Sequence, residues 1–147
     1  MADAPSEILE HGCSILDPVL LKYGFRRAQL VSGKSSGGPF ASTTYTNGNR
    51  NLELHFRYSL GLVTYHFGPL SMTHEAYMRV LLGPNGGNMY PGFSEQPLDA
   101  FRGLANDLKT KADAFLTGDS VAFGRHFEAA KKQAAVTGIA RLAESES

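Results

Sequence analysis

Four polar side chains with useful chemistry occupy alternate positions in two neighbouring segments of the chain. Glu53, His55 and Arg57 alternate with apolar residues, and His66 lies in a second alternating segment a few residues later. A guanidinium can bind a carboxylate or phosphate through two parallel hydrogen bonds, and imidazoles add hydrogen bonds that respond to pH. These residue types predict a surface that binds a small anionic ligand or a protein partner, unless the side chains simply face water, as one side of an antiparallel sheet often does.

The same residues also admit two catalytic interpretations. A carboxylate beside an imidazole can act as a general acid–base pair, for which Glu53 with His55 or His66 is the candidate. Imidazole and carboxylate ligands suit zinc, and a metal site would use His55 and His66 with His74 or Glu53. The sequence contains no HExxH motif and one cysteine. We therefore assign no catalytic residue, metal or cofactor, and favour a non-enzymatic binding domain over an enzyme.

A glycine-rich segment further along the chain is the second candidate for binding. Residues 83–93 read GPNGGNMYPGF, a composition that predicts an irregular loop. Met89 and Tyr90 offer apolar anchors on this loop. We expect them to contact a ligand or partner, alone or together with the polar residues above, unless the aromatic side chains fill the margin of the core instead.

An antiparallel hairpin is expected to position Glu53, His55, Arg57 and His66. Apolar and polar residues alternate over residues 52–59 and again over 62–67. A two-residue turn at Leu60-Gly61 would place His55 opposite His66. We call the polar side of this sheet the polar face; it consists of Ser42, Thr44, Glu53, His55, Arg57, Thr64 and His66. The other side must pack on helices; it consists of Thr43, Tyr45, Leu52, Leu54, Phe56, Tyr58, Val63, Tyr65 and Phe67.

Two earlier segments are predicted to extend the sheet. Residues 25–32 form a first strand, and residues 40–46 form a second one rich in Thr and Tyr. The intervening GKSSGG at 33–38 is glycine-rich and is expected to be a flexible connection. Asn47-Gly48 is a strong signal for a tight turn into the next strand.

Helical patterns precede and follow these strands. Apolar residues recur at helical spacing over residues 5–23, where Pro18 predicts a kink or a restart and Gly24 ends the helix. Ser71 or Thr73 is expected to cap a short helix after the sheet.

The C-terminal third is expected to be helical as well. The longest helix should begin at Pro97 and end at Gly118, with Asp107 among the polar residues outside its apolar stripe. Another helix follows over about 121–135, and the tail after about 138 is expected to fray. The fold class is therefore α+β: one domain over residues 1–147, with an antiparallel sheet of about four strands packed on one face by N-terminal and C-terminal helices.

Composition narrows the classes of partner and compartment. The 147 residues include 14 basic and 14 acidic side chains, so the chain has no basic excess to neutralise nucleic acid. Cys13 is the only cysteine, which excludes an internal disulfide, and we expect it to be a packing residue. The N-terminus does not resemble a signal peptide, and no stretch approaches the roughly 20 apolar residues of a membrane span. We therefore expect a cytoplasmic protein that binds neither nucleic acid nor membrane.

Two phrases carry a resemblance to known proteins. ILDPVLLKYGFRR, a helix closed by Gly-Phe before a strand, and the later AFLTGD resemble small uncharacterised bacterial α+β proteins, some of which are similar to immunity proteins of toxin systems. The resemblance implies a toxin as the partner and assigns no catalytic residue. A homodimer is also expected to be accessible, through an edge strand or through the polar face packed around a twofold axis.

Overall fold

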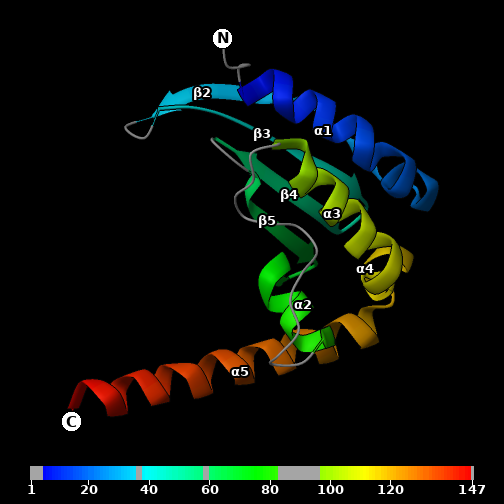
Figure 1. Ribbon diagram of the computed structural model, residues 1–147. Helices are drawn as coiled ribbons and strands as arrows, with labels where there is room; N and C mark the ends of the chain where they lie inside the picture. The colour runs from blue at the N-terminus through cyan, green and yellow to red at the C-terminus, as the bar shows by residue number, and fades with distance from the viewer. Residues whose placement is uncertain (1–4, 36–37, 58–59, 83–96, 147) are drawn as a thin grey trace.

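The computed structural model describes residues 5–35, 38–57, 60–82 and 97–146. Helices and an antiparallel sheet pack together in this part of the chain, and the main helices lie on one side of the sheet (Figure 1). The predicted α+β class, with an antiparallel sheet, is confirmed. No helix among these residues is long and apolar enough to cross a membrane.

The described residues form one six-stranded sheet in the order β1-β3-β4-β5-β6, with β2 also paired to β3. The strands are β1 (Arg26–Arg27), β2 (Val31–Ser35), β3 (Gly38–Asn47), β4 (Arg50–Phe56), β5 (Leu60–Phe67) and β6 (Leu70–Thr73). The prediction of about four strands is wrong. The predicted first strand over residues 25–32 is divided into β1 and the start of β2, and β6, with four residues, is too short for alternation to reveal it.

Tight turns join the central strands. Asn47 pairs with Arg50 across Gly48, whose positive φ of 60° suits glycine, so the predicted turn is confirmed. Phe67 pairs with Leu70 across a second two-residue turn that begins at Gly68, with φ of 59°. The second turn creates β6, which the sequence did not reveal.

The predicted pairing of β4 with β5 is wrong in register. Leu60 and Gly61 belong to β5 and do not form a turn, so His55 pairs with Leu62 and His66 pairs with Asn51. The pairing is displaced along β5 by four residues, and a bulge lies between His55 and Phe56. Because the displacement is an even number of residues, each side chain keeps its predicted face.

The glycine-rich connection is also different from its prediction. Gly33 pairs with Phe40 and Ser35 pairs with Gly38, so most of GKSSGG belongs to strands β2 and β3. Strand pairing uses backbone groups, which glycine supplies as well as any other residue. The glycine-rich composition of this segment therefore led to the wrong prediction of a flexible connection. β1 and β2 pair along the same side of β3, so the first strands lie at the sheet edge as expected.

The helices are α1 (Pro5–Leu20), η1 (Leu21–Tyr23, a 3₁₀ turn), α2 (His74–Leu82), α3 (Pro97–Lys111), α4 (Asp113–Thr117) and α5 (Ser120–Glu146). Gly24 ends η1 with φ of 88°, and Thr73 Oγ1 accepts a hydrogen bond from Ala76 N, so the predicted stop and cap are confirmed. The expected restart at Pro18 does not occur, because α1 continues through that residue to Leu20.

The predicted helix from Pro97 to Gly118 is divided. α3 ends before Ala112, whose N–H donates to Asp107 O five residues back, and α4 then runs to the C-cap Gly118. Ala112 is fully buried, so the interruption lies inside the packed helix layer. The apolar stripe continues across it and conceals it in the sequence.

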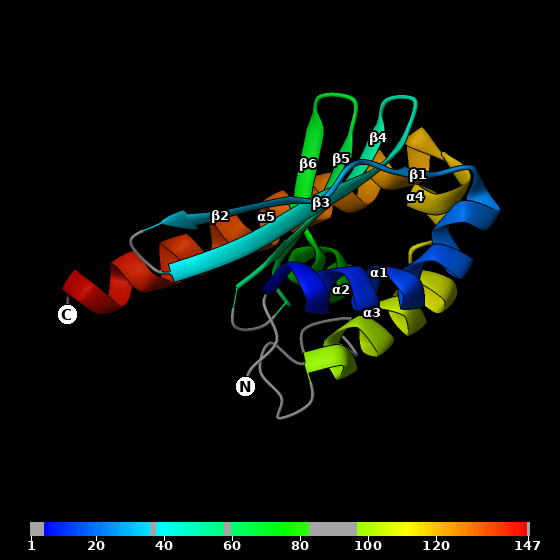
Figure 2. The ribbon, with the colours of Figure 1, turned by 90° about the horizontal axis from the view of Figure 1, so that it is seen from above.

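α1 and α3 lie side by side over the apolar side of the sheet (Figure 2). Gly12 permits this close packing, since a Cβ at that position would overlap the buried Phe101 ring. Eight aromatic rings lie in the core, and their stacked and edge-on contacts join Phe25 after η1, the sheet, α2 and the C-terminal helices. These rings are Phe25, Phe56, Tyr65, Phe67, Tyr77, Phe101, Phe115 and Phe123.

Candidate functional site

The polar face lies on the side of the sheet away from α1 and α3 and remains accessible. The Glu53 side chain is 51% exposed and His66 is 36% exposed. His55 and Arg57 are partly exposed on the same side. The alternation of β4 and β5 explains this arrangement, because Leu52, Leu54 and Phe56 between them are buried.

Glu53 and His66 form an ion-pair geometry on this face. His66 Nε2 lies 3.5 Å from Glu53 Oε1 across β4 and β5. Their Cα positions are diagonal, since Glu53 pairs with Thr64 and His66 with Asn51. The structure therefore brings together one of the two predicted carboxylate–imidazole pairs, through a register that the sequence did not give.

His55 belongs to a different cluster on the polar face. Its ring stacks on Phe40 with centroids 5.3 Å apart and an interplanar angle of 25°. The Arg57 guanidinium lies 5.9 Å from the centre of the same Phe40 ring. Phe40 thus holds an imidazole and a guanidinium close together, an arrangement suited to a carboxylate or phosphate of a partner.

Sequence reasoning missed Phe40. The available signal was its position: Phe40 precedes Ser42 and Thr44 at intervals of two, which places all three on the same side of β3. The sequence pattern predicts only that Phe40 begins a strand. An aromatic residue on an otherwise polar side is the feature that marks the cluster.

The three histidines considered for a metal site do not converge. His74 begins α2 and is fully buried on the apolar side of the sheet, whereas His55 and His66 lie on the polar face. Among residues 5–35, 38–57, 60–82 and 97–146, no three His, Cys, Asp or Glu side chains are grouped so that they could hold a metal ion.

His74 instead belongs to a buried hydrogen-bond network with Tyr65 and Asp107. Tyr65 Oη lies 2.6 Å from His74 Nδ1, and His74 Nε2 lies 2.8 Å from Asp107 Oδ2. Lys111 Nζ lies 3.6 Å from the other carboxylate oxygen. Such a relay resembles catalytic arrangements, but the side chains of both His74 and Asp107 are 0% exposed. Its position in the core fits a structural role.

The expectation that Asp107 lies outside the apolar stripe of α3 is wrong. Asp107 is adjacent to the buried Leu108 and one turn beyond the buried Leu104, which turns its carboxylate inward. His74 sits 33 residues earlier in the chain. Nothing in a single sequence links two residues at that separation, so the network was not predictable.

Cys13 is buried, and the low polarity of its surroundings raises the pKa of its thiol. Its backbone carbonyl accepts a hydrogen bond from Tyr45 Oη, which also donates to Asp17 Oδ1 at 2.6 Å. Burial likewise raises the pKa of Tyr45. This environment agrees with a packing role for Cys13 and joins α1 to β3.

The second predicted site, the loop at 83–93 with Met89 and Tyr90, lies outside the described residues. Comparisons of the chain with protein-family models, with curated proteins and with solved structures find no match. The resemblance to immunity proteins therefore stays a prediction, and the functional argument depends on the geometry of the molecule itself.

Proposed function

We propose that this chain is a non-enzymatic protein-interaction domain that binds its partner on the polar face. The observation that carries the proposal is the Phe40–His55–Arg57 cluster, which presents an aromatic ring, an imidazole and a guanidinium on an accessible sheet. Arginine and aromatic side chains dominate the binding energy of protein interfaces. An acidic side chain of the partner would bind between Arg57 and His55.

The shape of this surface favours a protein over a small anionic ligand. Small molecules usually bind in concave sites that enclose most of their surface. Three cavities in the described part of the chain are lined by helix residues and by Leu30 and Leu70, and by no residue of the polar face. A sheet surface that crosses β3, β4 and β5 suits a broad contact instead.

Affinity purification from the cells that produce the protein would test this proposal. The bait would be the full chain, compared with a variant carrying His55→Ala and Arg57→Ala. Arg79→Ala is the matched control, since Arg79 is an exposed arginine of α2 that pairs with Glu75 away from the polar face. We expect a protein that the wild type and the control retain and that the double variant loses, with Kd raised at least about tenfold.

Equal retention by all three proteins would show that the polar face does not bind the partner. A partner that is lost by Arg79→Ala as well would point to a general effect of charge. Circular dichroism of each variant would establish that the fold is intact before the binding results are compared.

An acid–base enzyme is the second candidate, favoured by the 3.5 Å approach of His66 to Glu53. A carboxylate that orients an imidazole can move a proton in hydrolysis. Turnover of an ester, phosphoester or peptide substrate that Glu53→Gln abolishes, while Arg79→Ala leaves it unchanged, would support this function. Turnover that survives Glu53→Gln would assign the activity to another site or a contaminant.

A toxin is the partner class that the resemblance of ILDPVLLKYGFRR and AFLTGD implies. Co-expression with the protein encoded by the neighbouring gene would test this more specific proposal. Protection of growth by the wild type, lost with the double variant at His55 and Arg57, would support an immunity function located on the polar face. We propose the cytoplasm of a bacterium as the setting for either kind of partner.

A second copy of the chain is a further partner that the sheet edge could accommodate. β2 has no strand beyond it among the described residues, and Val31 on this strand is 58% exposed. An unpaired edge can add a strand from a symmetric copy. Analytical ultracentrifugation of the wild type and Val31→Lys would show whether a dimer forms through this edge.

A further inference from the structure

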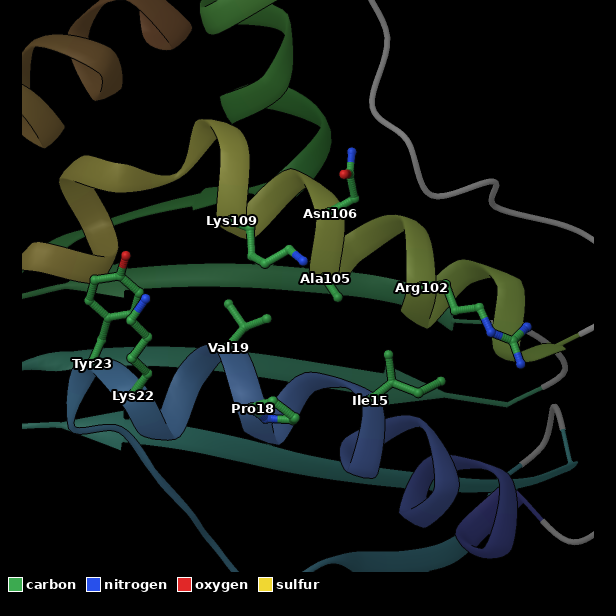
Figure 3. A pocket seen from close by; sticks show the side chains of 9 residues that line it. All are labelled: Ile15, Pro18, Val19, Lys22, Tyr23, Arg102, Ala105, Asn106 and Lys109. Atoms are coloured by element: carbon green, nitrogen blue, oxygen red, sulfur yellow. The ribbon is translucent and has the colours of Figure 1, made fainter.

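A groove runs between α1 and α3 on the side of these helices away from the sheet (Figure 3). Its volume is about 550 Å³. This size falls within the range of roughly 300–1,000 Å³ in which proteins bind small organic molecules. The side chains that line it are Ile15, Pro18, Val19, Lys22, Tyr23, Arg102, Ala105, Asn106 and Lys109.

The groove has an apolar middle because of the spacing along both helices. Ile15 and Val19 on α1 and Lys22 on η1 follow one another at four and three residues, and Arg102, Ala105 and Lys109 follow one another at three and four residues on α3. The small side chain of Ala105 faces Val19 across the middle of the groove (Figure 3). Apolar side chains therefore lie between Arg102 and Lys22, and the ammonium group of Lys109 lies beside them (Figure 3).

The cations at the two ends differ in their partners. Arg102 Nη1 is paired with Asp99 at 2.8 Å, and in Figure 3 its guanidinium points past the end of the groove. Lys22 and Lys109 lie farther along the groove from Arg102 (Figure 3). The Lys109 ammonium lies beside Val19 and Ala105, and the Lys22 ammonium lies over the Tyr23 ring. Neither lysine forms an ion pair within the described part of the chain. Among the described residues, no acidic side chain lines the groove. One end is thus positively charged without a neighbouring carboxylate.

We propose that this groove binds a small organic anion with an apolar tail, of the class of medium-chain carboxylates. The carboxylate lies beside the ammonium group of Lys109, which donates a charge-assisted hydrogen bond to it, and the ammonium group of Lys22 adds a second positive charge beyond Val19. The tail lies over Val19 and Ala105 toward Ile15, where it removes apolar surface from water. Charge complementarity fixes the direction of the ligand, with its headgroup away from Arg102.

This site is independent of the proposed interaction surface. The groove belongs to the helix layer, and the polar face lies on the opposite side of the sheet (Figures 1 and 3). The two sites share no residue. A molecule that binds in the groove therefore leaves the polar face accessible to a protein partner.

Titration of the full chain with decanoate, followed by nuclear magnetic resonance and calorimetry, tests the proposal. We expect saturable binding of one decanoate, with the largest chemical-shift changes at Ile15, Val19 and Ala105. The variant with Lys22→Gln and Lys109→Gln should bind about tenfold more weakly, which corresponds to about 1.4 kcal/mol. The control variant, Lys34→Gln with Lys131→Gln, has the same change in net charge at two exposed positions outside the groove and should bind as the wild type does.

Two further measurements examine the apolar part and the headgroup separately. Ala105→Leu fills the middle of the groove and should weaken decanoate binding without changing Lys22 or Lys109. Decanol, which has the same tail without the charge, should bind much more weakly than decanoate to the wild type. The circular dichroism spectrum and the midpoint of urea unfolding of each variant establish that it is folded.

Four results would overturn the proposal. These are undetectable decanoate binding, equal affinity for decanol and decanoate, equal weakening by the groove and control variants, and shift changes confined to the polar face. A dimer whose formation perturbs Val19 and Ala105 would also overturn it, since a second copy of the chain would then occupy the groove.

Discussion

The sheet places two histidine–carboxylate pairs on its opposite sides, and the comparison between them shows how burial changes the meaning of the same chemistry. Tyr65 and His66 are consecutive in β5, so their side chains point in opposite directions. On the buried side, Tyr65 contacts His74, and His74 Nε2 lies 2.8 Å from Asp107 Oδ2. The side chains of His74 and Asp107 are not exposed. On the polar face, His66 Nε2 lies 3.5 Å from Glu53 Oε1, and about a third to half of each side chain is exposed.

Water accounts for the contrast. Charged and polar groups in the core have lost their hydration, so removing one partner leaves the other without compensation. The exposed pair keeps its water, and each side chain can exchange its partner for solvent. We therefore expect the buried network to determine stability and the polar face to be available for binding.

The largest difference should come from replacing one histidine on each side. His74→Ala leaves Asp107 buried without its imidazole and should lower the free energy of unfolding by about 3–5 kcal/mol. His66→Ala on the polar face should lower it by less than about 1 kcal/mol. Urea denaturation followed by circular dichroism measures both values. Similar losses for the two variants would refute the assignment of a structural role to the buried network alone.

The next prediction concerns the close packing that covers the buried side. Gly12→Ala introduces a methyl group against the Phe101 ring, which is fully buried and cannot move aside cheaply. We expect a loss of about 1–3 kcal/mol from this overpacking. Gly124→Ala in α5 is the control, because nothing lies within 4 Å of a Cβ at that position. Helix propensity predicts that the control gains up to about 1 kcal/mol.

Much of this contrast could be predicted from the sequence, because alternation is a local property. The alternation correctly predicted the apolar side, with Leu52, Leu54 and Phe56, and the polar side, with Glu53 and His55. An error of four residues in register left both sides intact, although it replaced the expected pairing of the two polar-face histidines with a Glu53–His66 contact.

The remaining features depend on contacts between distant parts of the chain. Asp107 meets His74 only because α3 packs beside the start of α2, and its place at the border of an apolar stripe gave no sign of burial. The Phe40 cluster depends on the pairing of Ser42 with His55, which follows from a turn at Gly48 that was predicted. That cluster could have been inferred from the pattern, whereas the buried network could not.

A titration at high pH would extend the comparison to Tyr77, which packs edge-on against Tyr65 on the buried side. Burial raises the pKa of Tyr77 to about 12, above its ordinary value of 10. The neutral phenol is therefore favoured by folding, and this contribution to stability is complete below pH 10 and is lost as the pH rises toward 12.

The loss should reach about 1 kcal/mol at pH 11 relative to pH 9. Tyr77→Phe removes the phenol and should lose correspondingly less stability over this interval. Urea denaturation of both proteins at pH 9, 10 and 11 measures the difference. Parallel curves for the two proteins would contradict a raised pKa at Tyr77.

The smallest expected effect belongs to the Glu53–His66 pair and is the most informative about function. A double-mutant cycle of Glu53→Gln and His66→Gln should give a coupling energy of about 0.5 kcal/mol or less at neutral pH. Added salt should reduce it further, because mobile ions screen exposed charges. Urea denaturation of the four proteins at low and high salt gives the coupling at each ionic strength.

A coupling of 2 kcal/mol or more, on the order of that of a buried charged hydrogen bond, would contradict the picture of a solvated pair. If the coupling energy is small and the variants fold, side chains of the polar face can be substituted without destabilising the core. Under that condition, loss of a partner by variants at His55, Arg57 or His66 can be attributed to the interface itself. The side of the sheet that contributes least to stability is then the side on which binding can be measured most cleanly.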